Sequence, residues 1–165
     1  MNKNEFLDTL KTFTEKAVSE LILPCRVQGK GEEQSCRAAE VHKMRLPDSK
    51  AATKKAPYII HQIITSDDVQ QEGKKTEAHV QLRSIFCVYC DDEEEGSLML
   101  LELMERVRIA LLRTRLLDNR FLLDITASPM QTLIYPDDTA PYFAGELLTV
   151  WRLPAVEREV REWLQ

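Results

Sequence analysis

The chain contains little glycine and little proline, and it has no long hydrophobic run. Its 165 residues include 5 glycines and 7 prolines, which excludes a collagen-like or low-complexity chain. No apolar stretch approaches the ~20 residues that cross a bilayer. Lys3, Glu5, Asp8 and Lys11 interrupt the first segment, which therefore does not resemble a secretion signal. We expect a protein of the cell interior with no membrane partner.

The sequence also lacks the cationic surplus that nonspecific binding to nucleic acid requires. It has 22 lysines and arginines against 27 acidic residues, a formal net charge of −5, so no nucleic acid recognition is expected. Hydrophobic residues make up 44% of the chain, which is enough for a core. Chains near ~150 residues bury roughly 68–70% of their unfolded surface. We therefore expect one domain over residues 1–165 that needs no disulfide or metal.

Familiar catalytic motifs are missing as well. The sequence has no Gly-x-Ser-x-Gly element and no glycine-rich phosphate loop. His42, His61 and His79 are spread along the chain, without a second histidine at the spacing that a metal site on a helix needs. The expectation is a protein with no catalytic residue, no metal ligand and no cofactor.

Among the four cysteines, only Cys87 and Cys90 have a familiar ligand spacing. A zinc knuckle needs both sulfurs to face one ion, whereas side chains three apart in a strand point to opposite faces. The acidic run that follows also disfavours a reactive thiolate. We interpret this pair as buried small apolar side chains, and Cys25 and Cys36 as reduced thiols. A zinc- or thiol-dependent module stays open as the weaker alternative.

Apolar periodicity predicts a mixture of helices and strands. Spacings of three and four residues indicate helices, of which the first is ended by Pro24, and alternation indicates strands. The expected fold class is α+β: a mostly antiparallel sheet packed by a long central helix, with N-terminal and short C-terminal helices. The predicted helices cover residues 6–22, 98–117 and 154–165, and the predicted strands cover 58–65, 78–90, 121–125, 130–135 and 142–153.

Two charged segments are predicted to be exposed. Residues 24–57 form a long basic loop region in which only 41–46 has a strand-like pattern. Residues 66–77 form a long hairpin arm or loop between the first two long strands, which pair antiparallel, and residues 66–68 suit a turn. Charged loops on a rigid scaffold are frequent binding elements, so these segments are candidate interaction loops. Their candidate residues are Lys50, Lys54, Lys55, Asp67, Asp68, Lys74 and Lys75.

Five consecutive acids precede the long helix. Acidic side chains at a helix start meet the positive end of the macrodipole, and Asp92 and Glu95 have capping-box spacing. A solvated helix start is the simpler interpretation of this acidic patch. An acidic patch that binds a neighbouring subunit or partner is the functional one. Its members are Asp91, Asp92, Glu93, Glu94 and Glu95.

The order of elements resembles a known family of structural proteins. The pattern runs from an amphipathic opening helix through a basic loop with Leu46-Pro47-Asp48 to a strand opened by Ala56-Pro57-Tyr58-Ile59-Ile60. A long hairpin, an acid-led helix and a closing strand pair follow. Over roughly residues 1–153, this order resembles that of the tail terminator, or tail completion, proteins of tailed bacteriophages and prophages. The segment 24–57 with its two cysteines and the helix expected from Pro154 depart from the family pattern.

The resemblance implies a small α+β subunit of a ring, commonly a hexamer, which caps the tail tube. The partners expected from it are other copies of the chain, the tail tube protein and the head connector proteins, in a virion or in the cytoplasm of a bacterial host. The family has no catalytic residues to carry over. A non-catalytic adaptor that binds one protein partner without forming a ring is the main alternative. In the ring interpretation, deletion of residues 67–76 is expected to abolish assembly and to leave the monomer folded.

Overall fold

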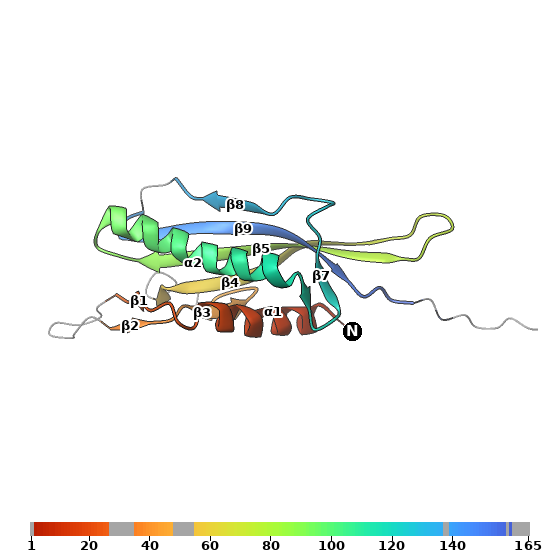
Figure 1. Cartoon of the computed structure of the whole chain (residues 1–165), viewed down its shortest axis with the longest axis horizontal. Coiled ribbons are helices and arrows are strands. Elements are labelled where there is room, and N and C mark those ends of the chain that lie inside the picture. The colour runs from red at the N-terminus through yellow and green to blue at the C-terminus, as the bar shows by residue number, and fades with distance from the viewer. Residues whose placement is uncertain (1, 27–34, 48–54, 137–138, 158, 160–165) are drawn as a thin grey trace, which may run out of the picture.

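The structure is a computed structural model that describes all residues except 1, 27–34, 48–54, 137–138, 158 and 160–165. Its described part contains two helices and a curled mixed sheet, so the α+β class is confirmed. The sheet has seven strands in the order β3-β4-β5-β9-β7-β6, and β8 also pairs with β9 (Figure 1). All pairings in this sheet are antiparallel except that of β3 with β4.

Helix α1 covers Lys3–Val18, and Asn2 caps it by accepting a hydrogen bond from the Glu5 amide at 3.0 Å. The predicted first helix is therefore confirmed, but its expected end at Pro24 is wrong. After Val18 the chain turns so that Leu23 is buried in the core. Strand β1, Leu23–Pro24, then pairs with β2, Cys36–Arg37.

Three long strands form the centre of the sheet. Strand β4, Tyr58–Val69, and strand β5, Glu77–Tyr89, form an antiparallel hairpin, as predicted. Strand β9, Tyr142–Leu153, pairs with β5 over its whole length. The short edge strand β3, Glu40–Lys43, runs parallel to β4 and overlaps the strand-like pattern at 41–46, whereas the strand at Cys36–Arg37 was not predicted in the basic loop region. The Val41 side chain of β3 is buried in the core, which explains why this part of the basic segment forms a strand.

Helix α2 covers Glu93–Thr114 and begins five residues before the predicted start, because Asp92 accepts a hydrogen bond from the Glu95 amide at 2.9 Å. The description of a single central helix is not confirmed, since α1 and α2 pack on the same face of the sheet (Figure 1). Buried side chains from both helices meet alternate residues of β5 and β9 there. Phe6 of α1 lies 5.3 Å from Phe121 and 5.2 Å from Trp151, ring centre to ring centre.

Short strands complete one side of the sheet. Strands β6, Leu116–Leu117, and β7, Phe121–Leu123, form a tight hairpin in which Asp118 and Asn119 both have positive φ. Strand β8, Gln131–Ile134, pairs with the middle of β9. The prediction of a C-terminal helix that begins at Pro154 is wrong for residues 154–157, which follow the end of β9 and have no helical structure. Residues 158 and 160–165, where the rest of that helix was expected, lie outside the described part.

Candidate interaction surfaces

The β4–β5 hairpin projects beyond the body of the molecule (Figure 1). Asp67 and Asp68, which suited a turn in the sequence, instead continue β4 and lie opposite His79 and Ala78. Backbone pairing along the hairpin therefore overrides their turn preference. The actual turn contains Gly73, whose φ is +74°, a conformation that favours glycine.

The charged residues of this arm are open to solvent. Asp67, Asp68, Lys74 and Lys75 are all exposed, and the arm also carries Glu72. The structure therefore brings these four candidate interaction residues together on one projecting element. Asp67 and Asp68 pair with His79 and Ala78, which also pair with β9, so the base of the arm is part of the main sheet.

The lysines of the other candidate loop are placed only in part. Lys50 and Lys54 lie outside the described residues. Lys55 is half-buried, and its ammonium group donates a hydrogen bond to the Pro47 carbonyl. Because that contact is internal, Lys55 supports the path of its own segment and is a weaker candidate for docking an acidic partner.

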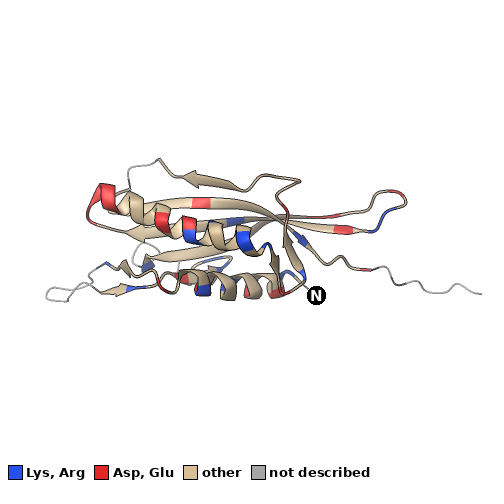
Figure 2. Ribbon diagram, in the orientation of Figure 1, with Lys and Arg blue, Asp and Glu red and all other residues tan. Residues whose placement is uncertain are grey.

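The acidic patch is a helix start, as the simpler interpretation held. Asp91, Asp92, Glu93, Glu94 and Glu95 are all exposed. Asp92 caps α2, and Asp91 accepts a hydrogen bond from the Tyr89 hydroxyl at 2.8 Å. The start of α2 and the tip of the β4–β5 hairpin lie at opposite ends of the molecule (Figure 2). The patch therefore cannot contact the arm of its own chain.

The cysteines do not gather into one site. Cys87 and Cys90 are both buried, as predicted, and burial raises the pKa of the Cys87 thiol to about 11. Cys36 lines the same hollow of about 420 Å³ as Cys90, whereas Cys87 lies opposite Tyr58 in the β4–β5 ladder. In the described part of the chain, no group of three or more His, Cys, Asp or Glu side chains is placed to hold a metal ion.

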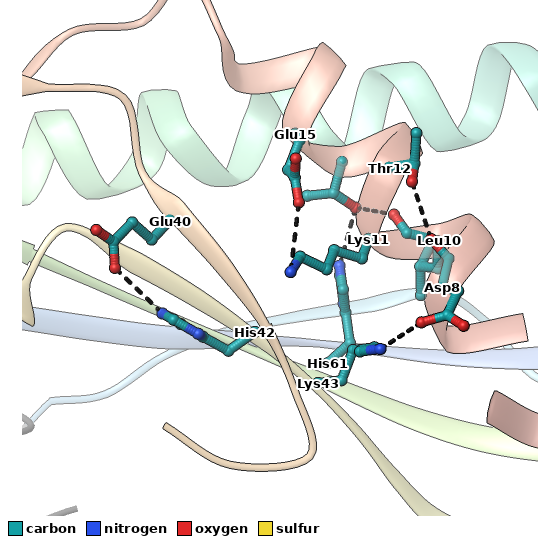
Figure 3. A network of polar contacts seen from close by, with 10 residues as sticks. Asp8, Leu10, Lys11, Thr12, Glu15, Glu40, His42, Lys43 and His61 are labelled. Atoms are coloured by element: carbon teal, nitrogen blue, oxygen red, sulfur yellow. Dashed lines mark hydrogen bonds and ion pairs between the residues drawn. The ribbon is translucent and has the colours of Figure 1, made fainter. Parts of the chain in front are cut away.

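A buried histidine joins α1 to the sheet (Figure 3). His61 is fully buried, with Nε2 2.8 Å from the Thr14 hydroxyl and Nδ1 2.8 Å from the Ser84 hydroxyl. The Thr14 hydroxyl donates its hydrogen to the Leu10 carbonyl, so it accepts from Nε2–H, and Nδ1 accepts from Ser84. This arrangement fixes a neutral tautomer, and burial lowers the pKa of His61 to about 3. The group is structural, because it has no access to a substrate.

The opposite face of the sheet carries a polar cluster that periodicity did not reveal. Glu146 accepts a hydrogen bond from the Tyr135 hydroxyl at 3.0 Å and lies 3.7 Å from Arg83, which donates to Gln62. Burial, followed by the bond to Glu146, raises the pKa of Tyr135 to about 12. Among the described residues, no helix covers this face. Only the strand order places these side chains together, so the sequence alone gave no signal for them.

The sheet ends on both sides in a short strand. Strand β3 pairs on one side only, with β4, and β8 pairs on one side only, with β9, among the described strands. All four residues of β8 are exposed, including Leu133 and Ile134, which are 48% and 45% exposed. Open strand edges of this kind can pair with another chain. They were not candidate sites in the sequence, since neither edge has a distinctive composition.

These surfaces have no precedent among the proteins compared with this chain. No protein-family model matches the sequence, and neither does any curated protein. Within the described residues, no helix is both long enough and apolar enough to span a membrane. The surfaces themselves are therefore the basis for a functional proposal.

Proposed function

We propose that the chain is a structural protein of a phage or prophage tail, which forms a ring that terminates the tail tube and contributes to head–tail joining. The observation that carries the proposal is the seven-stranded sheet, backed by helices on one face and unpaired at both edges among the described strands, from which a hairpin arm projects (Figure 1). Repeated head-to-tail contacts between two different surfaces of one chain produce a ring when the rotation closes.

In this proposal the subunits do no chemistry. The one fully buried histidine is tied to two hydroxyl groups, and the Cys87 thiol is kept protonated by burial. The exposed charges instead lie on the arm and at the start of α2, where they can contact neighbouring subunits, the tail tube protein and the head connector proteins. The ring lies in a virion or in the cytoplasm of a bacterial host, and its proposed subunit number is that of the family which the sequence resembles, commonly six.

The arm gives the proposal its most direct structural variant. Replacing residues 68–78 with Asn-Gly leaves Asp67 and His79, which are direct partners in the ladder, flanking a two-residue turn. The removed segment contains no residue of the core, and only Thr76 and Ala78 in it are half-buried, so the monomer is expected to fold. Loss of the arm is expected to abolish assembly.

Electron microscopy of the untagged protein measures this outcome. The wild type is expected to form rings with an open centre, and the variant with the short hairpin is expected to remain monomeric with an unchanged circular dichroism spectrum. If the variant forms rings as well as the wild type, the arm is not part of the contact between subunits. A wild type that stays monomeric and binds one partner without forming rings would instead support an adaptor.

A further inference from the structure

The two open edges of the sheet match each other in position and in hydrogen-bonding groups. Val41 of β3 lies opposite Ile59, Ile59 opposite Phe86, Phe86 opposite Gly145, and Gly145 opposite Ile134 of β8. The same path joins Lys43 to Thr132 through His61, Ser84 and Leu147. Both edge strands therefore lie at one level along the strand direction, on opposite sides of the sheet.

The backbone groups that point outward are known from the groups that point inward. The Glu40 amide donates to the Pro57 carbonyl just before β4, and the Met44 amide donates to the His61 carbonyl of β4. Successive residues of a strand alternate, so Val41 and Lys43 direct their amides outward. The Tyr135 amide donates to the Ala144 carbonyl of β9, so Thr132 and Ile134 direct theirs outward. Each edge thus offers two residues at the same spacing. The Lys43 carbonyl already accepts one bond, from the Arg45 amide, and its second lone pair is open.

We infer that β8 of one copy pairs antiparallel with β3 of the next copy, with Ile134 opposite Val41 and Thr132 opposite Lys43. This inference rests on the proposed ring and names its contact. Along the sheet, β3 and β9 run one way and β8 runs the other, so copies that keep the same orientation meet with β8 antiparallel to β3. A shift of two residues in this register would leave one of the outward pairs unmatched.

Side chains agree with the same register. Val41 and Ile134 both lie on the helix-bearing face, because their ladder partners Ile59 and Gly145 do, and His42 and Leu133 both lie on the other face. Ile134 would therefore enter the groove of about 480 Å³ between α1 and β3, which Ala39 and Val41 help to line. Leu133 would cover His42, whose buried Nε2 atom makes no hydrogen bond although a Glu40 carboxylate oxygen lies 3.4 Å away.

The charges around the groove also suit an uncharged strand. The residues beside β3 are paired within their own chain: Lys11 with Glu15, Lys43 with Asp8, and His42 with Glu40 (Figure 3). Strand β8 has the sequence Gln-Thr-Leu-Ile and brings no charge. Its docking leaves no charge without its partner, whereas a charged strand would.

The geometry also bears on ring closure. In this register a neighbouring copy lies beside the first without a step along the strands. Absence of a step along the axis is one of the two conditions for a closed ring, and the other is a rotation between copies that divides a full turn.

Substitution of one outward amide tests the edge. Thr132→Pro removes the Thr132 amide hydrogen, which faces away from β9, and proline is tolerated at such edge positions. Thr132→Val keeps that hydrogen and is the matched control. The proline variant is expected to raise the concentration at half-assembly at least tenfold, with the circular dichroism of the monomer unchanged, and the valine variant is expected to assemble like the wild type. Wild-type assembly by a folded proline variant would overturn the inference and leave the ring proposal standing.

Cross-linking tests the register and serves also if the proline variant misfolds. In a background with Cys25→Ser and Cys36→Ser, His42→Cys and Leu133→Cys become direct partners in a non-hydrogen-bonded pair, with Cα atoms ~4.5 Å apart, which a disulfide can join. Diamide, which takes two electrons and two protons from each thiol pair, is expected to produce a ladder of covalent oligomers. His42→Cys with Gln131→Cys is the control, because its diagonal Cα separation of ~7–8 Å is too long.

The outcomes separate the two proposals. A ladder from the matched pair and none from the diagonal pair supports the register. Rings without a ladder from the matched pair, or with equal ladders from both, overturn this interface while the proposed function survives. Absence of any oligomer of the wild type overturns both.

Discussion

His61, a residue type often used in catalysis, has a structural role in this protein. Its two nitrogens are saturated by hydroxyl groups from α1 and β5, so the ring joins three elements in one hydrogen-bonded chain. The side chain is fully buried and keeps its neutral form. The side chain stabilises the fold only in this neutral form, because a charged ring buried here would have no counter-ion among its two partners.

The stability of the protein is expected to fall as the pH decreases below about 6.5, the ordinary pKa of histidine. The pKa of folded His61 is about 3, so between these two values the unfolded chain binds a proton that the folded chain does not. The free energy of unfolding therefore decreases toward low pH, with a slope of at most about 1.4 kcal/mol per pH unit from this group.

Urea unfolding at several pH values between 7 and 5 measures the slope. The variant His61→Gln keeps hydrogen-bonding groups and cannot titrate, so its slope is expected to be smaller than that of the wild type. The difference between the two slopes isolates His61 from the carboxylates and from the other two histidines. Equal slopes would show that the buried ring is not the cause.

At the scale of elements, α2 is positioned by its first turn. Gly96 lies in that turn, and a Cβ atom at this position would come within 2.2 Å of the Phe143 ring on β9. The missing side chain thus allows the helix start to approach the sheet. The acidic patch is held at the end of the molecule by this contact and by the Asp92 cap.

Gly96→Ala is expected to destabilise the protein by about 1 kcal/mol, although alanine is the better helix former, because overpacking costs ~1–3 kcal/mol and exceeds the ~1 kcal/mol gain in helix propensity. Ser97→Ala, at the exposed neighbouring position, is the control and is expected to change the free energy of unfolding by less than about 0.5 kcal/mol. Thermal or urea unfolding measures both. A Gly96→Ala variant more stable than the wild type would contradict the proposed packing.

The elements with strong periodic patterns were predictable from the sequence. The structure contains the predicted helices α1 and α2, the β4–β5 hairpin and strand β9. Each of these elements buries one regular face, which leaves a periodic pattern in the sequence. The two-residue strands β1, β2 and β6 were missed, since so short a segment carries no periodic pattern. Strand β3 falls on a predicted strand-like pattern, but its parallel pairing with β4 depends on a distant partner, which local pattern does not contain. Asp67 and Asp68 were assigned to a turn because residue preference was considered without the pairing that extends β4.

The candidate surfaces were predictable to a smaller degree. Exposure of the arm and of the acidic patch followed from their charge. The Arg83–Glu146–Tyr135 cluster and the two sheet edges depend on strand order, which neither composition nor spacing encodes. Four of the residues named in advance, Asp67, Asp68, Lys74 and Lys75, do share one element.

At the scale of the whole molecule, an arm and an acidic helix start lie at opposite ends of an elongated body, and open edges lie on opposite sides of its sheet (Figure 2). A four-residue ladder alone is small beside the ~800 Å² that each partner of a standard interface buries. In the proposed ring the arm therefore adds to the edge contact, and assembly depends on both. Loss of the arm is expected to abolish assembly, and loss of the edge contact alone is expected to weaken it.

Native mass spectrometry of the untagged wild type, over a concentration series, tests the central claim most directly. The account predicts a single closed oligomer, of the same subunit number at every concentration above its threshold, at the mass of the polypeptide alone. A monomer at all concentrations, or a series of oligomers that lengthens steadily with concentration, would contradict a closed ring.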